Sequence, residues 1–174
     1  MRINKSGILK IISLLIIITI YVFTPIKDLD KDVINPDGIN WHTRTQAFTK
    51  ELSEKSYRDT FQAYHPGITL MWISGPLLNF FKPSLATIQN TVDPKTVFLD
   101  QDYYAKLSVV IFCTLIFLLT FIVLWKMIGF KYSVFYSIIF TLEPFLIGMR
   151  RLYHLDYLMT VLLFLSFLLL WLTP

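Results

Sequence analysis

The sequence predicts an all-α integral membrane protein with about four transmembrane helices and a long first extracytoplasmic loop that contains interfacial helices. Two observations carry this prediction. Hydrophobic residues make up 55% and aromatic residues 16% of the 174-residue chain, a composition typical of membrane proteins. The apolar residues also gather in runs close to the roughly 20 residues that a helix needs to cross the hydrocarbon core of a bilayer.

The first predicted span covers residues 7–24. This run is interrupted only by Lys10, Ser13 and Thr19. It follows basic residues, as the apolar region of a signal peptide does, but it is longer than that region usually is, and no small-residue cleavage site follows it. We therefore expect an uncleaved transmembrane helix.

Residues 25–104 form the predicted outer loop. The Asn-Pro-Asp-Gly sequence at 35–38 is a turn signal. Residues 40–57 place apolar side chains near one face, which predicts a helix lying at the membrane interface. Pro66 can start a second helix, and residues 68–81 are apolar but too few to span comfortably, so an interfacial or re-entrant helix is expected.

Residues 82–102 are predicted to be loop. Three further spans follow, at residues 107–125, 132–149 and 155–172. The connection between the last two is very short, so we expect them to form a tight antiparallel hairpin.

The distribution of Lys and Arg predicts the orientation. Basic residues precede or begin the first span and bracket the turn between the second and third spans, as in cytoplasmic segments. We therefore expect a multi-pass protein, in the plasma membrane, with a cytoplasmic N-terminus and an extracytoplasmic loop and hairpin tip. The net charge of +4 reflects this topology, and no basic-aromatic patch indicates nucleic-acid binding. Cys113 is the one cysteine, which excludes an intrachain disulfide.

Charged side chains are costly near lipid, yet several are predicted to gather at the outer membrane face. Some belong to the outer loop and others to the hairpin tip, and one lies about two turns before the outer end of the third span. The candidate functional residues are, in chain order, Asp37, Arg44, His65, Glu143, Arg150, Arg151, His154 and Asp156.

Four segments, spread over nearly the whole chain, carry a resemblance to a known family. They are Asp37 with Arg44 and Phe48, the run Tyr64-His65-Pro66-Gly67-Ile68-Thr69-Leu70-Met71-Trp72, the run Glu143-Pro144-Phe145-Leu146-Ile147-Gly148, and Arg151 with His154-Leu155-Asp156. In these segments the chain resembles the N-terminal part of C-type membrane glycosyltransferases. The protein O-mannosyltransferase-like and aminoarabinose-transferase-like enzymes form the most similar branch.

The resemblance implies transfer of a sugar from a polyprenyl-phosphate carrier to a protein, lipid or glycan acceptor at the outer membrane face. It maps a catalytic base onto Asp37 and a second acid onto Asp156. Many relatives carry another acid directly after the first, where this chain has Gly38. Relatives also have many more spans, so the resemblance implies that this chain is a piece of a longer enzyme.

The chemistry of such a transfer explains the residue types. A carboxylate is suited to deprotonate the acceptor, and fixed cations are suited to stabilise the departing phosphate. Arginine matches phosphate oxygens through its planar fork, and one displacement step would invert the anomeric centre. We expect the donor phosphate to be bound by Arg44, His65 and Arg151, with Arg150, Glu143 and His154 in supporting roles.

Simpler explanations stay open at this stage. Asp37 could serve a turn, Asp156 could stabilise a helix N-terminus, and the arginines could reach lipid headgroups. A non-catalytic subunit that binds lipid-linked sugar, or a transporter or flippase fragment with Glu143 as coupling site, are the alternative functions, although a transporter should place its charges near the midplane. Metal dependence is also open, because oxygen and nitrogen ligands are present but no close-spaced metal motif is.

Overall fold

The computed structural model describes residues 5–32, 34–62, 67–89 and 94–172. This part of the chain is helical and contains no strand, which confirms the predicted all-α class. The α-helices are α1 (Lys5–Ile26), α2 (Pro36–Ser53), α3 (Ile68–Gln89), α4 (Pro94–Ile128), α5 (Phe130–Leu142), α6 (Pro144–Arg150) and α7 (Leu155–Leu172), with short 3₁₀ turns η1 (Leu29–Lys31) and η2 (Tyr57–Thr60).

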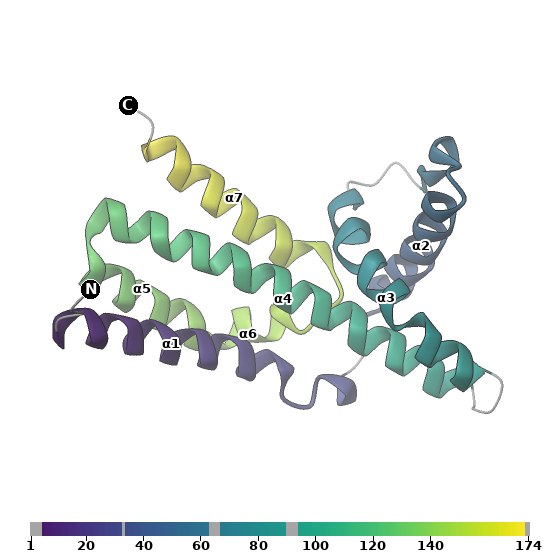
Figure 1. Ribbon diagram of the computed structural model, residues 1–174, viewed down its shortest axis with the longest axis horizontal. Helices are drawn as coiled ribbons and strands as arrows, with labels where there is room; N and C mark the ends of the chain where they lie inside the picture. Colours follow the sequence, from purple (N-terminus) through teal and green to yellow (C-terminus); the bar gives the residue numbers. More distant parts are fainter. Residues whose placement is uncertain (1–4, 33, 63–66, 90–93, 173–174) are drawn as a thin grey trace.

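Helix α4 is the central helix of the structure. Figure 1 shows α1, α5 and α7 alongside the half of α4 that leads to its C-terminus, and α2 and α3 around the other half. The start of α1, the end of α7 and the turn between α4 and α5 lie at one end of the bundle (Figure 1). The turn between α6 and α7 lies away from that end, beside the start of α2, so the hairpin tip and the outer loop are neighbours.

Three helical segments are long and apolar enough to cross a membrane: Gly7–Lys31, Phe98–Ile128 and Leu155–Leu172. A fourth is possible if α5 and α6 together count as one span, although their axes are bent by 67°. The chain is thus a multi-pass membrane protein by helix length and composition. The predicted bounds of the last span, residues 155–172, agree with α7.

The third predicted span, residues 132–149, is broken rather than continuous. Pro144 is the first residue of α6 and cannot donate a helical hydrogen bond. The carboxylate of Glu143 caps the new helix by accepting from the backbone N–H of Leu146 at 2.6 Å. The Glu-Pro pair therefore ends one helix and starts another.

The prediction of loop over residues 82–102 is wrong for the described residues 82–89 and 94–102, and residues 90–93 lie outside the described part of the chain. Helix α3 continues to Gln89, and α4 begins at Pro94 and runs unbroken for 35 residues. Charged residues suggested a loop, but Asp102 and Lys106 lie one helical turn apart and form an ion pair inside the protein. The second span therefore extends well beyond the predicted start at residue 107.

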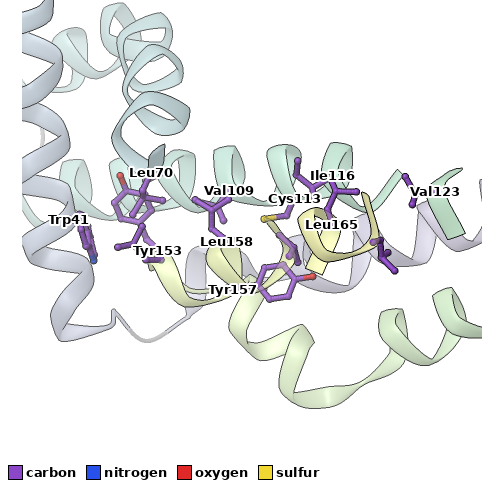
Figure 2. Packing of buried hydrophobic residues seen from close by; sticks show 14 of the residues in the cluster. Trp41, Leu70, Val109, Cys113, Ile116, Val123, Tyr153, Tyr157, Leu158 and Leu165 are labelled. Atoms are coloured by element: carbon purple, nitrogen blue, oxygen red, sulfur yellow. The ribbon is translucent and has the colours of Figure 1, made fainter. Parts of the chain in front are cut away.

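Two glycines allow α2 and α3 to approach closely. A Cβ atom on Gly67 would lie 1.8 Å from the Trp41 ring, and one on Gly75 would lie 2.5 Å from Thr49 Oγ1. Both helices were expected in the outer loop, and the structure packs them against each other, with α3 against α4 and with side-chain contacts from α2 to α4. Figure 2 shows Trp41 of α2, Leu70 of α3 and Tyr153 of the α6–α7 turn together at one end of the main apolar cluster.

Candidate functional site

A polar pocket of about 130 Å³ lies where the start of α2 meets the hairpin tip. Asp37, Asn40, Trp41 and Arg44 line it from α2, and His154 lines it from the turn before α7. The structure thus brings together groups that are more than a hundred residues apart in the sequence.

Asp37 is held at the first turn of α2. The side chain of Asn35 caps this helix by accepting from the Asp37 backbone N–H at 3.2 Å, and Pro36 is its first residue. The Asn-Pro-Asp-Gly sequence is therefore a helix start. Because Asn35 performs the capping, the Asp37 carboxylate is left free of that task, and its side chain is 68% exposed.

His154 stands between two carboxylates. Its Nε2 atom is 3.6 Å from Asp37 Oδ2, and its Nδ1 atom is 3.2 Å from Asp156 Oδ2. The backbone N–H of Asp156 also points at Nδ1, at 3.3 Å. One imidazole therefore contacts both predicted acids, with each ring nitrogen directed at a different one.

Asp156 lies in the first turn of α7, where a negative charge is favoured by the helix dipole. Its side chain is 65% exposed, so the carboxylate remains open to solvent. At this position Asp156 both stabilises the N-terminal end of α7 and contacts His154.

Arg44 supplies positive charge to the pocket. Its guanidinium carbon lies 4.9 Å from the centre of the Trp41 ring, in a cation–π arrangement. Among the described residues it has no ion pair with a carboxylate. The Trp41 ring is itself fixed by burial and by contact with Gly67.

Arg151 does not fit the predicted role as a phosphate ligand. Its guanidinium makes two hydrogen bonds of 2.6 Å to the carboxylate of Asp32. The remaining N–H groups point at backbone carbonyls at the end of α1, including those of Lys27 at 2.6 Å and Asp28 at 3.1 Å. Asp32 also raises the pKa of Arg151 through this hydrogen bond. The Arg151 guanidinium therefore joins the end of α1 to the hairpin tip, and its N–H groups are already bonded to acceptors of the protein.

Arg150 does not reach toward headgroups, contrary to the alternative considered above. Its side chain is fully buried. The guanidinium donates to the carbonyls of Tyr21, Thr141 and Leu146 at 3.0, 3.1 and 3.3 Å. It also lies 4.1 Å from the centre of the Tyr21 ring. Arg150 therefore satisfies the backbone at the break between α5 and α6 and ties that break to α1.

Glu143 does not line this pocket. The Glu143 carboxylate is occupied in capping α6. His65 lies outside the described residues, so its predicted role as a phosphate ligand stays a prediction. No group of three or more metal-ligating side chains is found within the described ranges.

A second cavity, of about 460 Å³ and almost wholly apolar, lies between α3 and α4. Trp72, Ile73 and Leu77 line it from α3, and Ile111, Phe112 and Leu115 line it from α4. Trp72 was named above only as part of the resemblance, and here half of its surface is exposed beside the cavity.

A buried polar cluster behind the pocket was missed by sequence reasoning. His42 Nε2 lies 2.9 Å from Asp102 Oδ1, and Lys106 Nζ lies 2.5 Å from Asp102 Oδ2. Nearby, the Tyr153 hydroxyl is 2.6 Å from the hydroxyls of both Thr45 and Ser74. Burial raises the pKa of Tyr153 to about 12, so this hydroxyl stays neutral. The spacing of Asp102 and Lys106 was the one signal in the sequence that pointed to a helical ion pair.

Comparisons of the chain with protein-family models, with curated proteins and with solved structures found no match.

Proposed function

We propose that this chain forms part of a membrane glycosyltransferase that moves a sugar from a polyprenyl-phosphate donor to an acceptor at the extracytoplasmic face of the plasma membrane. One observation carries the proposal. Asp37, from the start of α2, and His154, from the hairpin tip, meet at a single polar pocket that also contains Arg44, and His154 contacts Asp156 beside it. This is the set of groups that the transfer needs.

The chemical roles follow from the positions of these groups. Asp37 takes the proton from an acceptor hydroxyl or amine, and the acceptor atom then forms a bond to the anomeric carbon. The bond between that carbon and the phosphate oxygen breaks, and the phosphate leaves with the electron pair. Arg44 stabilises the charge that develops on it. His154 and Asp156 hold Asp37 in place, and a single displacement inverts the sugar.

The apolar cavity between α3 and α4 suits the other part of the donor. A polyprenyl chain is hydrocarbon, and the cavity is lined almost entirely by apolar side chains. Trp72 at its edge belongs to α3, and Gly67, which directly precedes this helix, contacts Trp41 of the polar pocket. The acceptor can be a protein, a lipid or a glycan, because the chain's described residues favour none of these.

The Asp37→Asn variant tests the proposal in a transfer assay. Membranes containing the protein, expressed from its complete reading frame, would be offered several polyprenyl-phosphate sugars. We expect transfer to fall by about 10²- to 10⁴-fold, while donor binding and thermal stability change little because the Asp37 side chain is exposed. Asp30→Asn is the matched control, since Asp30 is an exposed outer-loop acid that lies outside the pocket. Unchanged turnover would remove Asp37 from the role of base, and a product of retained configuration would overturn the single displacement.

A non-catalytic subunit that binds lipid-linked sugar is the second candidate. It is favoured by Gly38, which stands where many members of the resembled family have a second acid. The same assay separates the two functions, because a binding subunit would retain the donor without releasing polyprenyl phosphate. The transporter alternative loses its coupling site, because the Glu143 carboxylate is engaged by the backbone of α6.

A further inference from the structure

The buried cluster of His42, Asp102 and Lys106 holds three ionisable side chains within the protein. Their exposed fractions are 2%, 4% and 1% respectively. Burial of a charged group costs several kcal/mol per ion, which its partners must offset. Apolar side chains of similar volume would often fill the same space with at least equal stability. The pocket reaction proposed above does not use any of these groups.

The cluster joins the two helices behind the pocket. His42 follows Trp41 in α2, about one helical turn after Asp37, and Asp102 and Lys106 belong to α4. The carboxylate of Asp102 accepts from the histidine ring at one oxygen and pairs with the lysine at the other. The hydrogen bond between His42 and Asp102 therefore fixes the orientation of α2 relative to α4.

The same helix is joined to the hairpin tip by Tyr153. The His42 ring packs on the Tyr153 ring, with centroids 4.6 Å apart. The hydroxyl of Tyr153 bonds to Thr45 of α2 and Ser74 of α3 at 2.6 Å each. Tyr153 directly precedes His154, so its anchorage determines where the imidazole lies.

We infer that His42 and Tyr153 are positioning residues, which act through the Asp102–Lys106 pair and the Thr45 and Ser74 hydroxyls to hold Asp37 against His154. The pocket contact at 3.6 Å joins the exposed side chain of Asp37 to the half-buried side chain of His154, on separate elements. A contact of this length with one solvent-exposed partner contributes little to its own stability. Its geometry must come from the buried network. The consequence for catalysis rests on the function proposed above, whereas the geometric consequence does not.

The geometry can be measured without any reaction. Asp37→Cys and His154→Cys, introduced together in a Cys113→Ser background, would report their separation through the rate of cross-linking by a short bifunctional thiol reagent. His42→Ala and Tyr153→Phe should each slow this cross-linking several-fold in the folded, detergent-purified chain. His42→Gln should restore the rate, because the amide nitrogen of glutamine can replace the bonded Nε2 while Nδ1 has no partner to lose among the described residues.

One control variant and one conservative test variant keep the result specific. Thr43→Ala removes an exposed hydroxyl of the same helix that bonds only to the carbonyl of Ile39, and the rate should not change. Tyr153→Phe removes a hydroxyl and keeps the buried ring, so it tests the inference even if His42→Ala fails to fold. Cross-linking that is equally fast in both variants would overturn the inference.

The activity assay provides the second readout. With the native Asp37 and His154, the His42→Ala and Tyr153→Phe variants should lower kcat by up to about 10²-fold with little change in the KM for donor, as expected when a catalytic group is misplaced. A change in KM alone would contradict the positioning role. If the parent protein transfers no sugar, the proposed function fails, and the cross-linking rates still decide this inference.

Discussion

The arginines of the hairpin tip and the arginine of α2 differ in what surrounds their guanidinium groups. Arg150 and Arg151 are directed at backbone carbonyls and at Asp32. Arg44 rests on the face of Trp41 and borders a pocket. A guanidinium that donates to several acceptors of the protein itself holds the fold, whereas one that is not bonded in this way is able to bind an anion. Comparison of these sites shows that charge alone does not identify a functional residue.

The largest effect on stability is expected for Arg150→Ala. The change leaves the buried carbonyls of Tyr21 and Thr141 without this donor, and each costs about 1–3 kcal/mol. Unfolding in detergent, followed by circular dichroism, should therefore show a loss of about 3 kcal/mol or more. Arg58→Ala is the matched control, because Arg58 is exposed. A stable Arg150→Ala protein would mean that the carbonyls find water, and the contrast with Arg44 would disappear.

Some features of the fold and of the candidate site could be predicted from the sequence. The first and last spans are uninterrupted apolar runs, and their helices follow the predicted bounds closely. The convergence of Asp37 with the hairpin tip was a requirement of the predicted site, and the structure places these groups in one pocket.

Other elements depend on partners that are distant in the sequence. The Asp102 carboxylate is compensated in part by His42, which lies 60 residues away, so the start of α4 resembled a polar loop. Arg151 pairs with Asp32 across 119 residues, and no local pattern distinguishes this from an open phosphate site. Periodicity describes a helix face, but the neutralisation of a buried charge is a tertiary property.

A smaller loss of stability is expected for Arg151→Ala, about 2 kcal/mol. Its side chain is partly exposed, so water can replace some of its bonds to the end of α1. Asp32→Asn should cost a similar amount, and the double variant should cost less than the sum of the two because the residues share one ion pair. Fully additive losses in the double-mutant cycle would show that the pair contributes nothing.

Arg44→Ala should change function rather than folding. The cation–π contact between the half-buried Arg44 and the buried Trp41 contributes on the order of 1 kcal/mol. Binding of a polyprenyl-phosphate donor should weaken by about tenfold or more, because a charge-assisted hydrogen bond contributes about 1.5–3 kcal/mol. Arg44→Lys keeps the charge and should recover part of the affinity. Donor affinity that falls with Arg151→Ala but not with Arg44→Ala would reverse the comparison between the two sites.

The smallest effect on stability is expected for Asp156→Asn. An exposed acid in the first turn of a helix contributes about 0.3–1 kcal/mol through the helix dipole, and asparagine keeps the size of the side chain. The carboxylate beside His154 Nδ1 is replaced by an amide, while the backbone N–H of residue 156 still donates to that atom. Transfer activity should therefore fall further than stability, since the imidazole also contacts Asp37. If activity and stability fell in proportion, Asp156 would be a helix-end residue only, and the pocket would reduce to Asp37, His154 and Arg44.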